Sequence, residues 1–373
     1  MEEYKVSIKR NILLNPGPAT TTDSVKSAQV VPDICPREKE FGKIMEFVSK
    51  GLTDIVGNNN KYTTILFGGS GTAAVEAIIS SVCDEGTLLV INNGAYGKRI
   101  CEMAEIYGLN YLEYKSSSSK AIDLSDLEFV IKEREKSSHI TNLAVIHHET
   151  TTGILNDISA IGKICDKYNI NLIVDAMSSF AGIPIDMKEM NIKFLASSSN
   201  KCIQGMAGIS FVIAQKEALY KTKNIKPRNL YLNLYKQYEY FKENYQMRFT
   251  PPVQVLYALK QAIAEAQKET IEKRYERYRE CCRILWNGLD EIGLKKLVDE
   301  KNSSMLLTSI IEPKDKGYSF ESLHNYLYEN NITIYPGKVS SKDTFRIANI
   351  GDIYPEDMEN VVEKLKEYFK KIL

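Results

Sequence analysis

Short apolar runs recur along the first two thirds of the chain, and segments of a different periodicity separate them. Apolar runs with little polar alternation are typical of strands that are buried on both faces of a sheet. The runs that we interpret as strands span residues 63–68, 87–91, 142–148, 171–176, 194–199 and 209–214.

The segments between these runs place apolar residues at i, i+3 and i+4 spacing, which indicates amphipathic helices. Four of them separate the predicted strands, at residues 73–82, 98–108, 124–136 and 158–169. Because strand and helix alternate, the pattern predicts an α/β fold with a mostly parallel central sheet and helices on both faces.

The pattern changes near residue 256. Long charged helical segments follow, then strand-like runs at 305–311 and 344–351, and a final amphipathic helix, as expected for a smaller α+β domain. A chain of 373 residues is also longer than one core usually supports. We therefore expect an N-terminal segment that packs with the small domain, a large domain and a small C-terminal domain, at residues 1–15, 16–255 and 256–373.

Charge, cysteine positions and apolar runs limit the partners and the cellular compartment that we expect. Lys plus Arg and Asp plus Glu both total 48, with no long block of one sign, so we expect a small-molecule substrate and neither nucleic acid nor a membrane surface. The seven cysteines show no metal-ligand spacing, which favours a reduced, cytoplasmic compartment. The N-terminus lacks the pattern of a secretory signal, and no apolar run approaches the roughly 20 residues that span a bilayer.

Polar residues that end the apolar runs are the first candidates for chemistry, because ligands bind beyond the carboxyl ends of parallel strands. Residues 68–72 (GGSGT) follow one run and precede a helix. Free main-chain N–H groups there, with the hydroxyls of Ser70 and Thr72, would hold a phosphate. The same glycines could instead form an ordinary strand-to-helix turn.

Asp175 lies at the end of the run 171–176, and Lys201 comes shortly after the run 194–199. Alone, Asp175 could be a cap or turn residue and Lys201 a loop cation. With the Gly/Ser/Thr segment, however, they form the set that a pyridoxal 5'-phosphate site requires. The Lys201 amine would form a Schiff base with the cofactor aldehyde and later act as general base and acid, while Asp175 would keep the ring nitrogen protonated.

From residues 13–22 to residues 345–351 the chain resembles the fold-type-I, class-V aminotransferases. Several stretches are similar to the group in that family that acts on 2-aminoethylphosphonate and pyruvate: DICPREKEF (33–41), INNGAYGKR (91–99), HHETTTGILN (147–156), VDAMSSF (174–180), SSSNKCIQGMAG (197–208) and FRIANIGD (345–352). The resemblance implies a reversible, ping-pong transfer of the amino group of 2-aminoethylphosphonate to pyruvate, which gives phosphonoacetaldehyde and L-alanine. Met206-Ala207 departs from the family pattern, but leaves the lysine untouched.

The resemblance also implies roles for individual residues in holding the cofactor. Ser70, Gly71 and Thr72 are expected to bind its phosphate, and Tyr96 to stack over its ring. Within residues 149–152, a hydroxyl, of Thr150 or Thr152, is expected to approach the ring oxygen.

Three further residues are assigned by resemblance. Arg346 is expected to grip the acid group of the substrate with two parallel hydrogen bonds, and Arg37 is a second candidate for the phosphonate. Arg346 could instead be a strand-surface arginine of the small domain, although the resemblance favours the substrate role, and a helix N-terminal ion pair is an equally plausible role for Arg37. Thr250 resembles the residue that reaches the cofactor phosphate of the neighbouring subunit, so we expect a homodimer with shared active sites.

Other functions stay open at this point. An alanine- or serine-glyoxylate aminotransferase needs the same cofactor set. A cysteine desulfurase-like lyase needs a loop cysteine well after the lysine, and none follows Cys282. A non-catalytic relative would be expected to lose Lys201 or Asp175. Adjacent His147 and His148 would point to opposite faces of a strand, and we expect no metal.

Overall fold

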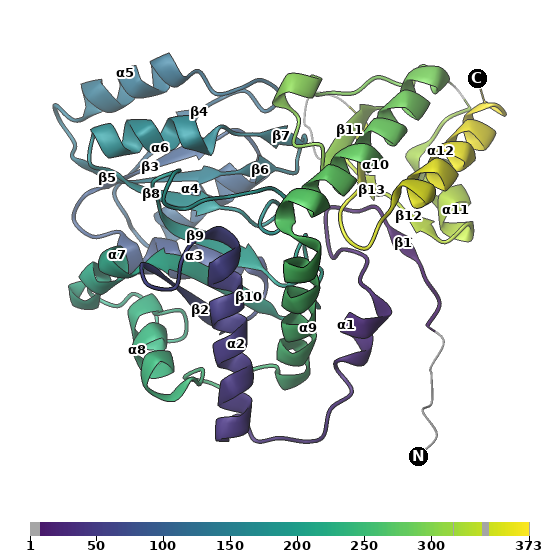
Figure 1. Ribbon diagram of the computed structural model, residues 1–373. Coiled ribbons are helices and arrows are strands. Elements are labelled where there is room, and N and C mark those ends of the chain that lie inside the picture. The colour runs from purple at the N-terminus through teal and green to yellow at the C-terminus, as the bar shows by residue number, and fades with distance from the viewer. Residues whose placement is uncertain (1–7, 316, 338–342, 373) are drawn as a thin grey trace.

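A seven-stranded sheet organises the larger lobe of the computed structural model (Figure 1), which describes residues 8–315, 317–337 and 343–372. Its strands lie in the order β2 (Tyr62–Gly68), β10 (Ile209–Gln215), β9 (Ile192–Ser198), β8 (Asn171–Asp175), β5 (Ile140–Ile146), β3 (Thr87–Asn92) and β4 (Tyr111–Lys115). β10 is antiparallel to both neighbours, and the other pairs are parallel. The predicted mostly parallel sheet is confirmed.

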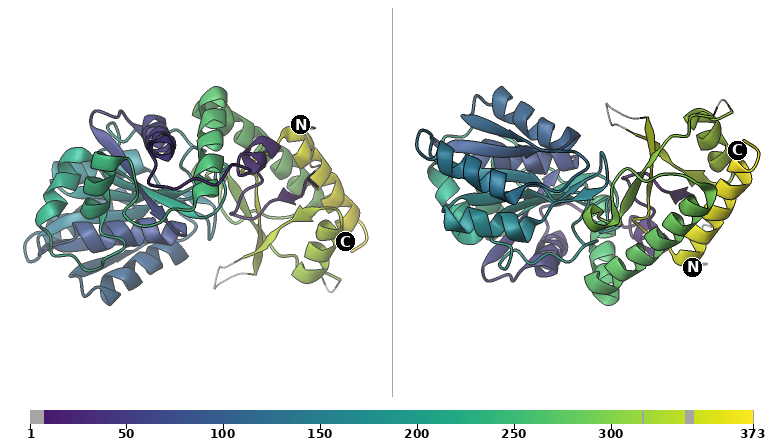
Figure 2. Two further views of the ribbon diagram at one scale, coloured as in Figure 1. Left: turned by 90° about the horizontal axis from the view of Figure 1, so that it is seen from below. Right: turned by 90° about the horizontal axis from the view of Figure 1, so that it is seen from above.

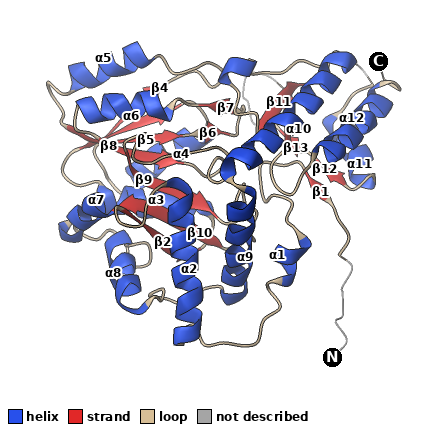
Figure 3. Cartoon of the chain, in the orientation of Figure 1, coloured by secondary structure: helices blue, strands red, loops and turns tan. Residues whose placement is uncertain are grey.

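Helices cover both faces of this sheet (Figures 2 and 3). One apolar core contains side chains from α2 (Lys39–Val56), α5 (Leu124–Arg134), α6 (Ile158–Lys167) and α9 (Val253–Glu269). The other contains side chains from α3 (Gly71–Val82), α4 (Ala95–Ile106), α7 (Lys216–Lys221) and α8 (Leu234–Asn244). Within β5, Leu143 and Val145 enter the first core and Ala144 and Ile146 the second, which is why the run shows no polar alternation.

The smaller lobe is built on a three-stranded antiparallel sheet in the order β11 (Leu307–Ile311), β14 (Thr344–Ala348) and β13 (Tyr335–Pro336). Its helices are α10 (Ile271–Ile292), α11 (Phe320–Glu329) and α12 (Pro355–Phe369). Short elements elsewhere are α1 (Asp23–Ser27), β6 (His148–Glu149), β7 (Ile154–Leu155) and the 3-10 turns η1 (Thr222–Asn224) and η2 (Glu300–Asn302). None of the helices in the described part of the chain is both long enough and apolar enough to cross a membrane.

The N-terminal segment belongs to the smaller lobe although the chain then enters the larger one. β1 (Ile12–Leu13) pairs in parallel with β12 (Ile332–Thr333), and Ile12 and Leu14 lie in the apolar core of the smaller lobe. Of the expected segment 1–15, residues 1–7 lie outside the described residues. This path carries the next residues, Asn15 to Thr22, past the interface between the lobes.

α9 and α10 form the second passage between the lobes. The core of the larger lobe includes α9 as far as Ala266, beyond the boundary expected after residue 255. Thr270, with φ of 66°, separates the two helices, and its side chain accepts a hydrogen bond from the N–H of Lys273 at the start of α10. The first turns of α10 therefore lie at the junction of the lobes.

Candidate active site

One cavity of about 260 Å³ lies where β2, β8 and β9 end and α3 and α4 begin. It is lined by six residues that the sequence singled out for cofactor chemistry, among others: Ser70, Gly71, Thr72, Tyr96, Asp175 and Lys201. Because these residues come from four separate segments, their meeting is a property of the parallel sheet, whose strands end at one edge.

Lys201 follows β9 and points its amine toward the N-terminal segment. Its Nζ donates a hydrogen bond to the carbonyl of Pro16 at 2.8 Å. Gly17 has φ of 137°, and a Cβ at that position would collide with Lys201 Nζ. Burial lowers the pKa of Lys201 and Arg346 lowers it further, whereas Cys202 and Asp175 oppose the shift. A lowered pKa favours the neutral amine, which is the nucleophilic form.

Asp175 ends β8 and is 8% exposed. Its Oδ1 accepts a hydrogen bond from the N–H of Met177 at 2.9 Å. Burial raises the pKa of Asp175 to about 6; the N–H of Met177 opposes that shift and Glu149 reinforces it. A cationic N–H donor beside this buried carboxyl group would favour its ionised form, because an opposite charge lowers the pKa of a carboxyl group.

The start of α3 presents main-chain N–H groups to the cavity. Ser70 is the N-cap residue and is exposed, and its side chain makes no capping hydrogen bond. The first N–H groups of a helix have no partner within the helix. A Cβ at Gly71 would collide with Met177, and the N–H of Gly69 donates to the carbonyl of Gly208 at 2.9 Å. The geometry therefore fits an anion held by the backbone.

Tyr96 lies in the first turn of α4, and Arg99 stands over its ring, with the guanidinium carbon 5.0 Å from the ring centroid. The N–H of Tyr96 donates to Glu149 Oε2 at 3.3 Å, and Glu149 Oε1 accepts from the N–H and the hydroxyl of Thr151, at 3.0 and 2.6 Å. Burial raises the pKa of Glu149. Glu149 thus supplies from a distant segment the acceptor that a capping side chain would give α4.

Thr150, Thr151 and Thr152 form the buried turn between β6 and β7. The carbonyl of Thr150 accepts a hydrogen bond from Arg346, and the Thr152 hydroxyl is buried with no hydrogen-bond partner in the described structure. The three threonines are not among the residues that line the cavity of the described chain. The expected approach of a Thr150 or Thr152 hydroxyl to the cofactor ring stays a prediction.

Arg346 lies in β14 and is 1% exposed. Its Nε and Nη2 donate to the carbonyl of Pro336 at 3.0 and 2.7 Å, and its Nη1 donates to that of Thr150 at 2.9 Å. Burial lowers the pKa of Arg346. The arginine does not itself line the cavity, but its charge contributes to the lowered pKa of Lys201.

Arg37 and Thr250 lie elsewhere. Arg37 donates to the carbonyls of Met247 and Arg248, at 2.6 and 3.0 Å, and so holds the segment that leads to Thr250. Thr250 is exposed. Neither residue lines the cavity of its own chain, as far as that chain is described. Their roles toward the substrate and the neighbouring subunit stay predictions.

His147 and His148 are buried, and burial lowers their pKa to about 3 and about 4. His148 Nε2 lies 2.9 Å from the hydroxyl of Ser304, and its Nδ1 lies 3.3 Å from the carbonyl of Ser178. Within the described ranges, no three His, Cys, Asp or Glu side chains gather as metal ligands do.

Arg99 and Glu149 are two residues of the site that the sequence did not single out. Arg99 lines the cavity, and it stands three positions after Tyr96, so that both residues share one face of α4. Glu149 directly follows the apolar run 142–148, and the strand-end argument that selected Asp175 could have selected it too.

The family model of the class-V aminotransferases matches residues 24–353. The chain belongs to this family. This class-V aminotransferase is 44% identical over 358 residues to the 2-aminoethylphosphonate–pyruvate transaminase of Bacillus cereus (strain G9842), covering 95% of this chain and 96% of the relative. The resemblance inferred from the sequence is confirmed.

Two further known proteins are similar to this class-V aminotransferase. It is 42% identical over 364 residues to a bifunctional phosphonoacetaldehyde hydrolase/aminoethylphosphonate transaminase of Clostridioides difficile (strain 630), covering 96% of this chain but only 56% of that longer protein. A crystal structure of an alanine–glyoxylate aminotransferase from Nostoc sp. matches with a TM-score of 0.88 at 24% identity, over 98% of this chain and 97% of the other. The second likeness shows the shared fold.

Proposed function

We propose that this class-V aminotransferase transfers the amino group of 2-aminoethylphosphonate to pyruvate and forms phosphonoacetaldehyde and L-alanine, reversibly and by a ping-pong mechanism. The observation that carries the proposal is the meeting of Lys201, Asp175 and the start of α3 around one cavity. The proposed substrates are those in the name of the relative that is 44% identical over 95% of the chain.

The residues of the cavity fit pyridoxal 5'-phosphate. Ser70, Gly71 and Thr72 would hold its phosphate at the start of α3. Tyr96 would cover one face of its ring, and Asp175 would accept a hydrogen bond from the ring nitrogen. When bound, the cofactor supplies an electron sink for the substrate carbon that loses a proton.

Lys201 would anchor the cofactor covalently and, once the substrate amine has replaced it, move the proton at the substrate carbon. Two observations support this role. Burial lowers the pKa of Lys201, which favours an amine able to accept a proton. The carbonyl of Pro16 and the close approach of Gly17 hold Nζ at one side of the cavity.

Arg346 would bind the acid group of the substrate. Three of its N–H groups bond the carbonyls of Pro336 and Thr150, which fixes the guanidinium plane and leaves further donors for an anion. Arg99, exposed and on the cavity wall, adds a second positive charge. Arg37 is the weaker candidate for the phosphonate, since its guanidinium bonds main-chain carbonyls outside the cavity.

A homodimer is also part of the proposal, with Thr250 of each subunit reaching the cofactor phosphate of the other. The exposure of Thr250 and its absence from the residues that line the cavity of its own described chain support this arrangement. All seven cysteines are free thiols, which supports a cytoplasmic location.

The test is a half-reaction on the purified protein loaded with pyridoxal 5'-phosphate. The visible absorption of the bound cofactor is followed while 2-aminoethylphosphonate, L-alanine or L-serine is added separately. We expect 2-aminoethylphosphonate and L-alanine to convert the cofactor to its aminated form, and Lys201→Ala to abolish the conversion. Conversion by L-serine but not by the phosphonate would favour the alanine/serine-glyoxylate alternative, and absence of any visible band would contradict an aminotransferase.

A further inference from the structure

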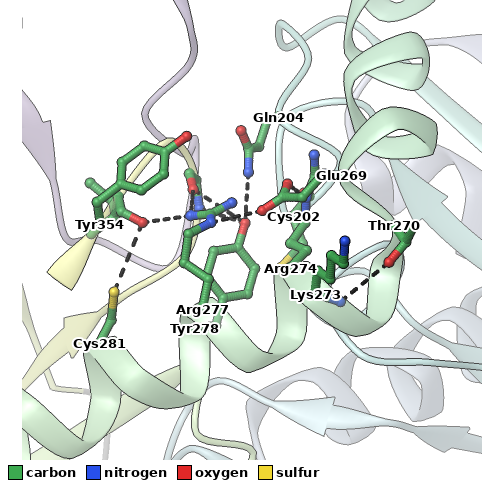
Figure 4. Close-up of polar contacts among 12 residues, drawn as sticks. Cys202, Gln204, Glu269, Thr270, Lys273, Arg274, Arg277, Tyr278, Cys281 and Tyr354 are labelled. Atoms are coloured by element: carbon green, nitrogen blue, oxygen red, sulfur yellow. Dashed lines mark hydrogen bonds and ion pairs between the residues drawn. The ribbon is translucent and has the colours of Figure 1, made fainter.

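Four side chains near the start of α10 form a polar cluster, which Figure 4 shows. Two of them are buried and two are partly buried. We call Glu269, Arg274, Arg277 and Tyr278 the α10 cluster. Arg274 is 1% exposed and Tyr278 is 0% exposed. Glu269 accepts hydrogen bonds from Arg274 Nε at 2.6 Å and from Arg277 Nε at 2.8 Å, so that the buried charge of Arg274 is paired.

Two members of the α10 cluster hold the turn that follows Lys201. Arg274 Nη1 donates to the carbonyl of Cys202 at 2.9 Å, and Gln204 Nε2 donates to the hydroxyl of Tyr278 at 2.8 Å. Gln204 has φ of 65°, a conformation that is uncommon for a residue with a side chain. Its N–H donates to the carbonyl of Lys201 at 2.8 Å, which closes the turn.

The other side of the same turn is held by the N-terminal segment. The N–H of Ala19 donates to the carbonyl of Asn200 at 3.0 Å, and Lys201 Nζ donates to the carbonyl of Pro16. The Tyr278 hydroxyl also accepts from the N–H of Gly351, in the smaller lobe, at 3.0 Å. Lys201 therefore lies on a turn that is fixed by α10 on one side and by the N-terminal segment on the other.

We propose that Arg274 and Tyr278 are positioning residues, which keep Lys201 Nζ in the cavity by fixing the main chain of residues 202–204. The inference rests on the proposed role of Lys201 as the cofactor anchor. Contacts that only join the two lobes would not need to reach this turn. Arg277 provides the comparison, because it shares Glu269 but donates to the carbonyls of Gly351 and Ile353, at 3.1 and 2.5 Å.

The comparison supplies a matched pair of variants, Arg274→Lys and Arg277→Lys. Each keeps a positive charge beside Glu269 and gives up the planar guanidinium, but only the first loses the hydrogen bond to Cys202. Tyr278→Phe removes the hydroxyl that Gln204 contacts. Tyr275→Phe is its control, since the Tyr275 hydroxyl, on the same helix, donates to the carbonyl of Ser304 at 3.5 Å.

The readout is the pH dependence of acetylation of Lys201 in the full-length, cofactor-free chain, with limiting acetic anhydride and peptide mass spectrometry. Burial and Arg346 lower the pKa of Lys201, while Cys202 and Asp175 face it with the opposite effect. Release of the turn would hydrate the amine, so we expect Arg274→Lys and Tyr278→Phe to raise the labelling midpoint by about half a pH unit or more. Thermal unfolding of all four variants shows whether each is folded.

Arg277→Lys and Tyr275→Phe are expected to keep the wild-type labelling midpoint of Lys201, even if thermal unfolding shows that they are less stable than the wild type. Equal midpoints for Arg274→Lys, Arg277→Lys and the wild type would overturn the proposal and leave the cluster a purely structural one. Equal shifts in Arg274→Lys and Arg277→Lys would overturn it as well, because the effect would then follow the loss of stability. The labelling uses no cofactor, so its result can be read even if the proposed aminotransferase reaction fails.

Discussion

The guanidinium of Arg346 donates a hydrogen bond of 2.9 Å to the carbonyl of Thr150, 196 positions earlier in the chain. This bond joins the smaller lobe to the turn between β6 and β7 in the larger one. Arg346 Nε and Nη2 meanwhile hold the carbonyl of Pro336. The proposed acid-binding group is therefore oriented by both lobes before any substrate arrives.

Arg346→Lys is expected to weaken the use of both acid-bearing substrates. A lysine cannot hold both carbonyls and present a planar pair of donors to an anion. Hydrogen bonds to charged groups contribute roughly 1.5–3 kcal/mol, and about 1.4 kcal/mol is a factor of ten, so kcat/KM should fall by about tenfold or more for pyruvate and for 2-aminoethylphosphonate. Steady-state kinetics with each substrate varied in turn measures the change.

Arg37→Lys is the control for that variant, and we expect it to change kcat/KM by less than about threefold, which is roughly half of the 1.4 kcal/mol that corresponds to a factor of ten. Arg37 bonds the carbonyls of Met247 and Arg248, outside the cavity. A loss confined to the phosphonate and as large as that of Arg346→Lys would instead make Arg37 the phosphonate ligand.

Gly17→Ala is expected to displace the Lys201 amine. A Cβ there would collide with Lys201 Nζ, and φ of 137° is strained for alanine. Gly108→Ala is the matched control, because Gly108 also has positive φ, 62°, but a Cβ there meets no atom within 4 Å. Cofactor affinity, measured by titration with pyridoxal 5'-phosphate, should fall at least about tenfold in the first variant only. Equal losses in both variants would contradict a specific effect of the clash with Lys201.

Asp175 is expected to make the cofactor-free protein less stable as the pH rises from about 4 to about 6. Burial raises its pKa to about 6 in the folded chain, against about 3.9 in an unfolded one, so the folded state binds the proton more tightly. The stabilisation present below pH 4 is lost as the pH passes the folded value. The difference is at most roughly 3 kcal/mol.

Asp175→Asn should remove this dependence, because the amide carries no proton to lose in that range. Chemical denaturation of both proteins between pH 4 and pH 7 measures it, and the variant should gain stability relative to the wild type as the pH rises. Parallel curves over the whole range would show that Asp175 does not titrate as its burial implies.

The strand-end residues that the sequence singled out line one cavity, for a physical reason. Asp175 and Lys201 follow apolar runs, and parallel strands end at a common edge, so the order of elements alone brings them together. Arg99 was missed because no apolar run marks it. β4 was also missed, because in this edge strand only Tyr114 is buried and the pattern of a buried run is lost.

The contacts that orient Lys201 could not be predicted from local sequence patterns. The Pro16 carbonyl lies 185 positions from Lys201 and Arg274 lies 72 positions from Cys202, and neither pairing leaves a periodic signal. The point where the chain passes from the larger lobe to the smaller one could not be predicted from local patterns either. α9 and α10 read as similar charged helices, but α9 packs in the larger lobe and α10 in the smaller one.

The role of Lys201 is tested most directly by reduction of the cofactor-loaded protein with borohydride, followed by peptide mapping. Reduction fixes the cofactor to the amine that holds it. The account predicts a pyridoxyl adduct on the peptide that contains Lys201, and none in Lys201→Ala. An adduct on a different lysine, or no adduct in a wild-type protein that has bound the cofactor, would contradict it.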